Sequence, residues 1–147
     1  MSELEQNLYK RVHVPSTNIQ PKPSKSYRGF YSGDSNKGFN LYDHELIKQD
    51  IVNHFHIRQG EKLGDPSFGC IIWDILFEPF TPALQKAIIE NVTFIINYDP
   101  RVQAENVIVD TYDNGIQITA TVSFLDYAIS EEMRFTFDQS VGLSLRN

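Results

Sequence analysis

The spacing of hydrophobic residues in this 147-residue chain changes at one point, and this change constrains the fold more than any other feature. Before Asp99 the apolar residues recur every three to four positions, as they do on the buried face of a helix. After Arg101 they alternate with polar residues, which is typical of a strand with one buried face. The chain is therefore expected to fold as an α+β domain, with helices followed by an antiparallel meander.

Three helices are expected before this point, each opened by a residue that can cap its first turn. Asp43 has a carboxylate that can accept from the amides of that turn, and the first helix is expected to run to about His56. Asp65 and Thr81 are each followed by proline, which suits the first helical position. Asp99-Pro100 is the expected stop of the third helix, because the residue before a proline is disfavoured in helical conformation.

The residues after Arg101 predict three antiparallel strands. The pair Asn114-Gly115 favours a tight two-residue hairpin, in which both loop positions need positive φ. The segments 116–124 and 133–137 then alternate apolar with polar residues. One face of this sheet is expected to pack on the helices, and the other to be solvated or covered by a partner.

Residues 1–26 are expected to form an extended arm on a single domain of residues 27–147. The arm is polar and carries three prolines within 15–23, which favours extended backbone without sheet bonding. It could be a solvated tail, although its apolar residues favour docking on a neighbour. Short strands are expected at 27–31 and 38–41.

Composition restricts the partners of the chain. Thirteen Lys and Arg against nineteen Asp and Glu give a net charge of -6, which disfavours binding to nucleic acid and to anionic membranes. The single cysteine, Cys70, cannot form an internal disulfide and is expected to be a packed thiol. No apolar stretch approaches the roughly 20 residues of a membrane span, and no signal-peptide core is recognised, so neither export by the usual route nor membrane insertion is expected.

Three short segments carry the most specific residues of the chain. In chain order they are Gly60-Glu61-Lys62 followed by Asp65-Pro66-Ser67-Phe68-Gly69, then Phe77-Glu78-Pro79, then Asp99-Pro100-Arg101. Together they resemble the family of phage baseplate wedge subunits, which has relatives in bacterial contractile secretion systems. The family pattern is similar to Gly-Glu-Arg, a Pro-x-Phe-Gly helix start, and Glu-Pro-Arg leading into a strand. The likeness covers residues 39–137.

Two residues depart from this pattern while keeping its charges. Lys62 stands where arginine is usual, and Asp99 stands where glutamate is usual. Lysine cannot make the bidentate fork of arginine, so the family contacts are expected to persist with altered reach.

The resemblance implies a structural protein without enzymatic activity. In that family the segment matched by Asp99-Pro100-Arg101 docks against a helical core bundle built by other wedge proteins. These residues, together with Glu61 and Lys62, are therefore the expected partner-binding set. The sheet would receive a strand from a tail sheath subunit and so initiate the sheath. The expected location is the tail baseplate of a virion, assembled in the host cytoplasm.

The same features also have local interpretations. Pro100 ends the helix, and Asp99 could simply pair with Arg101 inside the molecule. The sheet edge could be covered by the chain's own arm instead of by a partner. The sequence leaves both possibilities open.

A peptidoglycan hydrolase is the alternative from another functional class. Some members of the resembled family have carried a lysozyme label, and a glycosidase needs two carboxyl groups across one cleft. Glu61 and Glu78 are the candidate pair, although capping or ion pairing explains both equally well. A third possibility is the related subunit of a bacterial secretion baseplate.

No metal or cofactor is expected. His44, His54 and His56 lack the four-residue spacing of a helical zinc site, and no second cluster of Cys or His completes one. Gly60 and Gly64 are not followed by the Lys-Ser or Lys-Thr of a phosphate-binding loop.

Overall fold

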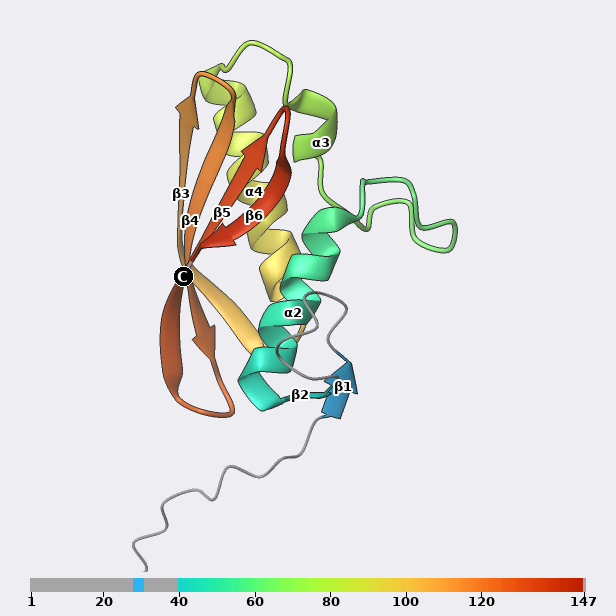
Figure 1. The fold of residues 1–147 in the computed structure, drawn as a ribbon, viewed down its shortest axis with the longest axis vertical. Coiled ribbons are helices and arrows are strands. Elements are labelled where there is room, and N and C mark those ends of the chain that lie inside the picture. The colour runs from blue at the N-terminus through green and yellow to red at the C-terminus, as the bar shows by residue number, and fades with distance from the viewer. Residues whose placement is uncertain (1–27, 31–39, 147) are drawn as a thin grey trace, which may run out of the picture.

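A four-stranded antiparallel sheet forms one layer of the molecule, and helices cover one of its faces (Figure 1). The structure, a computed structural model, describes residues 28–30 and 40–146, so the expected arm lies outside the described residues. Neighbouring strands of the sheet follow one another along the chain. They are β3 (Val102–Tyr112), β4 (Gly115–Phe124), β5 (Ile129–Asp138) and β6 (Gly142–Arg146).

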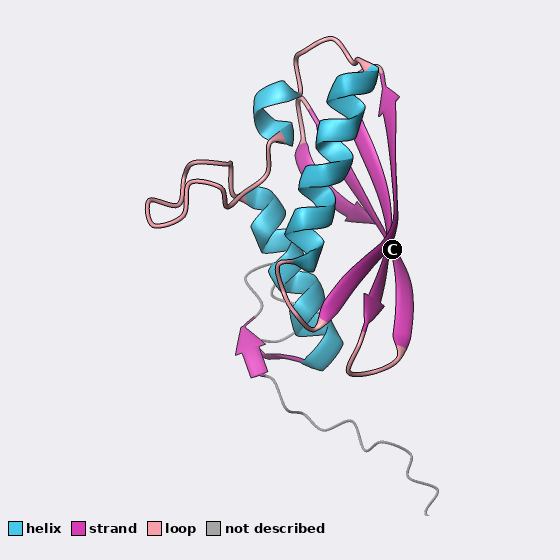
Figure 2. Cartoon of the chain, turned by 180° about the vertical axis from the view of Figure 1, so that it is seen from behind, coloured by secondary structure: helices cyan, strands magenta, loops and turns pink. Residues whose placement is uncertain are grey.

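Three helices in the described part of the chain precede this sheet. They are α2 (Asp43–His56), α3 (Ile72–Ile75) and α4 (Pro82–Asn97). Both long helices, α2 and α4, lie on the same side of the sheet, as the opposite views in Figures 1 and 2 show. The short strands β1 (Arg28–Phe30) and β2 (Asn40–Tyr42) pair antiparallel before α2. The predicted combination of helices with an antiparallel sheet is confirmed.

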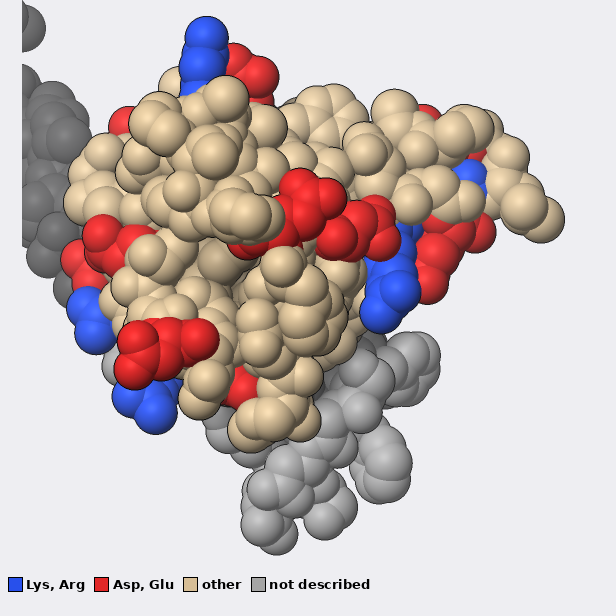
Figure 3. Space-filling model, turned by 90° about the horizontal axis from the view of Figure 1, so that it is seen from above, with Lys and Arg blue, Asp and Glu red and all other residues tan. Residues whose placement is uncertain are grey.

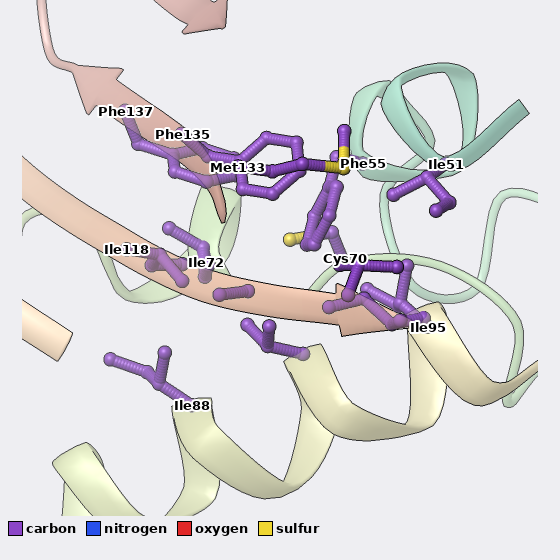
Figure 4. Packing of buried hydrophobic residues seen from close by; sticks show 14 of the residues in the cluster. Ile51, Phe55, Cys70, Ile72, Ile88, Ile95, Ile118, Met133, Phe135 and Phe137 are labelled. Atoms are coloured by element: carbon purple, nitrogen blue, oxygen red, sulfur yellow. The ribbon is translucent and has the colours of Figure 1, made fainter. Parts of the chain in front are cut away.

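Buried apolar side chains from the helices and the sheet form one cluster (Figure 4). The ring of Phe55 on α2 lies 4.5 Å from that of Phe135 and 5.9 Å from that of Phe137, both on β5. Every second residue of β4 from Ile116 to Phe124 is buried, which confirms the predicted alternation. Burying each large apolar side chain contributes about 1.5–3 kcal/mol, so this cluster fixes how the helices sit on the sheet.

Cys70 belongs to the same cluster and is fully buried. Burial raises the pKa of its thiol to about 12, so the reactive thiolate is scarce at neutral pH. The predicted packed thiol is confirmed.

The predicted second helix is wrong over most of its length. The Asp65 carboxylate accepts from Ser67 N–H and Oγ–H at 3.3 and 2.6 Å, which forms a local turn instead of a helix start. Gly69 has φ +116°, a value outside the helical range, and only Ile72–Ile75 is helical. The side chain of Asn91 on α4 accepts from Ile71 N–H at 3.1 Å and donates to the Gly69 carbonyl at 3.2 Å. These tertiary bonds hold the segment before Ile72 out of a helix.

The two other predicted helix starts have different outcomes. Thr81 caps α4 as expected, since its Oγ accepts from Leu84 N–H at 3.2 Å with Pro82 in the first turn. Asp43 is not the cap of α2: Tyr42 occupies that position without a side-chain capping bond. Asp43 is instead the first residue of the helix and is buried, with φ +52°.

The meander differs from the prediction at two places. The first hairpin loop is Asp113-Asn114, with Tyr112 paired to Gly115, and neither loop residue has positive φ. Gly115 is required for a different reason, since a Cβ there would lie 2.0 Å from the carbonyl oxygen of Phe137. The strand β6 is the second difference, because only three strands were expected.

Candidate partner-binding site

Asp99, Pro100 and Arg101, the last three residues before β3, form a rigid turn that we call the corner. The Asp99 carboxylate accepts from Arg101 N–H at 2.9 Å, from Nε at 2.9 and 3.0 Å, and from Nη2. Pro100 fixes its own φ, and the Asp99 carbonyl accepts from Val102 N–H at 3.2 Å. The hydrogen bonds from Arg101 hold the pKa of Asp99 below its ordinary value of 3.8. The local pairing that the sequence left open is therefore present.

Arg101 also reaches α2. Its Nη2 lies 3.6 Å from Asp50 Oδ2, and the side chain of Asp50 is 51% exposed. The pKa of Asp50 is raised above its ordinary value of 3.8. Burial is the main cause and the negative charge of Asp99 adds to it, while the positive charge of Arg101 acts in the opposite direction. Two carboxylates thus flank one guanidinium.

This corner forms part of a pocket between α2 and α4, which we call the α2–α4 pocket. Its volume is about 660 Å³. Asp50, Asn53, Asp99 and Arg101 supply its polar lining, and Pro100 also lines the pocket. The remaining lining is apolar or aromatic and consists of Ile51, His54, Ile57, Phe68, Ile95 and Tyr98. A mainly apolar concavity with a few polar groups is the usual form of a binding site.

His54 is sandwiched in the aromatic part of this lining. Its ring stacks on Phe68 with centroids 3.8 Å apart and planes 6° from parallel, and it meets Tyr98 edge-on at 5.3 Å. Only 6% of the residue is exposed, and its Nε2 has no hydrogen-bond partner in the described structure. Burial, aided by the charge of Lys62, lowers the pKa of His54 to about 4, so the ring is neutral at pH 7.

The loop of residues 58–69 contains Lys62 and also Phe68, which lines this pocket. It projects from the body of the molecule at the end of α2 (Figures 1 and 3) and carries Leu63, which is 97% exposed. Lys62 Nζ lies 4.3 Å from the centroid of the Phe68 ring. Glu61 instead accepts from Arg58 N–H at 2.9 Å and is not among the residues that line the pocket. The structure therefore brings Lys62 close to the pocket and leaves Glu61 at the base of the loop.

Neither the α2–α4 pocket nor a second, smaller pocket is lined by both Glu61 and Glu78. Glu78 lines this second pocket of about 240 Å³ between the α3 region and the β3–β4 hairpin, and Glu61 is absent from that lining. Hydrolysis of a glycosidic bond requires both carboxyl groups beside the same sugar. Neither of these two pockets brings the pair together.

Within residues 28–30 and 40–146, no three His, Cys, Asp or Glu residues come together in a way that could hold a metal ion. None of the described helices has the length and apolar character needed to cross a membrane.

The sheet has two outer strands, β3 and β6. Within the described residues, each pairs with one strand, so one backbone edge of each lacks a strand partner. The pairing of β3 shifts between Ala104 and Asn106, which marks a bulge. The shorter β6 has a continuous register with β5 over its five residues. Unpaired edges of this kind can accept a strand from another chain.

Comparisons with known proteins place this arrangement in a class. A family model described as Baseplate wedge protein gp25 matches residues 42–132, which include the loop, both long helices and the corner. The match covers more than half of the chain and identifies the class as that of baseplate wedge proteins. The chain belongs to the baseplate wedge protein gp25 family, which confirms the resemblance predicted from the three motifs.

The chain is also similar to one curated protein, Baseplate wedge protein gp25 of Enterobacteria phage T4. The two are 33% identical over 93 residues, which is 61% of this chain and 61% of the T4 protein. The match therefore spans less than two thirds of the T4 protein.

Two solved structures share the fold. The crystal structure of a protein named as a candidate tail lysozyme from Geobacter sulfurreducens has a TM-score of 0.58 and 19% identity, over 67% of this chain and 93% of that one. A chain in the cryo-EM structure of the anti-feeding prophage baseplate has a TM-score of 0.51 and 21% identity, over 67% of this chain and 80% of that one. At these identities the two structures support the fold alone.

Proposed function

We propose that this protein is a structural subunit of a phage contractile-tail baseplate wedge. It docks on a helical core of other wedge proteins through the corner, and its sheet accepts a strand from the tail sheath. The observation that carries the proposal is that the corner, matched by the family, lines the 660 Å³ α2–α4 pocket instead of being sealed in the core.

The internal pairing of the corner is compatible with docking. Asp99 engages Arg101 from one side and fixes the direction of its guanidinium, while Pro100 is exposed. A side chain held in place loses little conformational entropy when a partner binds. The pairing therefore prepares the corner for a contact as well as ending the helix.

The edge of β6 is the proposed receiver of the sheath strand. Its register with β5 is regular, whereas the bulge interrupts β3. A regular edge can continue the ladder of backbone hydrogen bonds with an added strand. In this proposal residues 27–147 form one domain, and its β6 edge templates the first sheath ring.

We infer that the protein works without catalysis. The pocket that Glu78 lines does not include Glu61, and the family and the T4 relative are both described as baseplate wedge proteins. The protein would assemble in the host cytoplasm and remain in the virion tail. A secretion baseplate is the alternative setting for the same mechanism.

The docking proposal is tested with Arg101→Ala. We expect the variant to fold, because Arg101 lies outside the buried core, but to be lost from purified baseplates, since the corner loses its cation. Arg134→Ala is the matched control, because Arg134 is exposed on the open face of the sheet and forms an ion pair with nearby Glu132 at 3.2 Å. Circular dichroism checks folding, and the copy number of the variant in baseplates measures docking. Incorporation of Arg101→Ala at the control level would refute the contact.

A further inference from the structure

Two backbone groups of β3 bond to side chains of α4. This helix packs against β3 more than against any other strand and lies on the helical side of the sheet (Figures 1 and 2). Asn97, the last residue of α4, accepts from Ala104 N–H at 2.8 Å. Gln85, near the start of the same helix, donates from Nε2 to the Val109 carbonyl at 3.2 Å. Both backbone groups are therefore bonded within the chain and face away from β4.

The spacing of the two side chains matches the spacing of the groups that they bind. Gln85 and Asn97 are twelve positions apart, which is about 18 Å along a helix. Ala104 and Val109 are five positions apart, which is about 17 Å along a strand. The end of α4 meets the start of β3, and the start of α4 meets the second half of β3, so the two elements run in opposite directions. The two bonds together hold α4 along the outer edge of the strand.

Two further features oppose the pairing of β3 with another chain. Val102 N–H donates to the Asp99 carbonyl at 3.2 Å, so the first amide of the strand is also bonded. The bulge leaves Glu105 between the paired residues Ala104 and Asn106, and Glu105 is exposed. Bulges and charged side chains both weaken the pairing of an outer strand with a strand from elsewhere.

The outer edge of β6 has no equivalent bonds. Among the described residues, no side chain donates to or accepts from the backbone of Gly142–Arg146. The strand pairs with β5 in continuous register. An incoming strand would therefore meet bonded groups on β3 and an edge without described partners on β6.

We propose that Gln85 and Asn97 block strand addition at β3 and thereby direct the strand of the sheath subunit to β6. To pair with β3, an incoming strand has to displace both side chains from the backbone groups that they bind. The inference rests on the proposed strand addition and assigns the residues that limit it to one edge of the sheet. The same two residues oppose pairing of β3 with a second copy of this chain.

Photocrosslinking in assembled tails tests the choice of edge. A benzophenone amino acid replaces either Asn106 on β3 or Ser144 on β6, both of which are exposed, in the full-length chain. In an otherwise wild-type chain we expect crosslinks to the sheath subunit mainly from position 144. In Gln85→Ala/Asn97→Ala, the ratio of sheath crosslinks at position 106 to those at position 144 should rise about tenfold, because the competing hydrogen bonds are lost.

The matched control on the same helix is Lys86→Ala/Glu90→Ala, since these exposed residues form an ion pair with each other at 3.8 Å. Its crosslink ratio should equal that of the wild type. An unchanged ratio in Gln85→Ala/Asn97→Ala would overturn the inference and leave the proposed function standing. Wild-type crosslinks mainly from position 106 would refute β6 as the acceptor, crosslinks from neither position would refute strand addition, and either result would also remove the inference.

A conservative replacement separates the hydrogen bond from the packing of α4. Asn97→Asp keeps an oxygen that can accept from Ala104 N–H, whereas Asn97→Ala removes it. Hydrogen exchange of the Ala104 amide in the purified protein, followed by NMR, should be slow in the wild type and in Asn97→Asp and about tenfold faster in Asn97→Ala. Equal exchange in all three proteins would overturn the inference, and this comparison decides it if the double variant does not fold.

Discussion

At the scale of single residues, the arrangement around Phe68 explains several properties of the pocket. His54 and Lys62 lie on opposite faces of this ring, the first as a stacked neutral imidazole and the second as a cation at 4.3 Å. The cation lowers the pKa of His54 in addition to the effect of burial. A residue of the projecting loop thus influences the protonation of a residue inside the pocket.

The lowered pKa of His54 makes stability depend on pH. Because the pKa is about 4 in the folded protein and 6.5 ordinarily, the unfolded chain binds the proton more readily. The stabilisation is complete above pH 6.5 and is lost as the pH falls from 6.5 towards 4. Between pH 6.5 and pH 4, we expect the free energy of unfolding to fall more for the wild type than for His54→Phe, and the difference should be about 1–3 kcal/mol. Urea titrations at a series of pH values measure this, and parallel curves for the two proteins would contradict it.

At the scale of elements, the loop of residues 58–69 owes its path to a glycine. Gly69 combines φ +116° with a close approach, since a Cβ there would lie 2.5 Å from the Arg58 carbonyl oxygen. Beside this close approach, Cys70 N–H donates to the Ile57 carbonyl at 2.7 Å, and the Cys70 carbonyl accepts from Gln59 N–H at 3.3 Å. The base of the loop is closed at this point, and Phe68 is thereby directed at His54.

Replacing this glycine should be costly. Gly69→Ala is expected to lower the free energy of unfolding by about 2–4 kcal/mol, because it adds both strain and a backbone clash. Gly64→Ala is the control within the same loop, since nothing lies within 4 Å of a Cβ at that position. Its expected change is within about 0.5 kcal/mol. Chemical denaturation of both variants measures the difference, and equal stabilities would show that the loop base tolerates a Cβ.

The β6 edge gives a second prediction at this scale. The backbone N–H groups of β6 that point away from β5 should exchange rapidly in the isolated protein, because no described strand pairs with them. In baseplates carrying sheath, these amides should become protected while those of β3 remain unchanged. Hydrogen exchange followed by mass spectrometry over residues 142–146 measures this. Protection appearing on β3 instead would move the sheath contact to the other edge.

At the scale of the whole molecule, the two proposed contacts lie on different elements. The corner and the α2–α4 pocket belong to the helical layer, and the β6 edge belongs to the sheet, so both can be occupied at once (Figure 1). The shared cluster of buried residues joins the two layers rigidly. Docking through the helices would therefore fix the direction in which the sheet presents its edge.

Cell-wall hydrolysis is the whole-molecule test of the enzymatic alternative. We expect the purified protein and its Glu61→Gln variant to release equal, background amounts of peptidoglycan fragments, because the pocket that Glu78 lines does not include Glu61. A turbidity assay with a known lysozyme as positive control measures this. Activity in the wild type that disappears in Glu61→Gln would establish a hydrolase.

Local physical rules allowed the sequence alone to specify much of this protein. Alternation along β4 and β5, the Thr81-Pro82 start of α4 and the corner after it depend on neighbouring residues, and the three motifs indicated the family. Tertiary contacts decided the rest. The bonds of Asn91 and the close approach at Gly69 replaced most of a predicted helix, and the packing of α2 against α4 brought Asp50 and His54 to the corner. The pocket depends on groups more than forty positions apart along the chain, so no local pattern could indicate it.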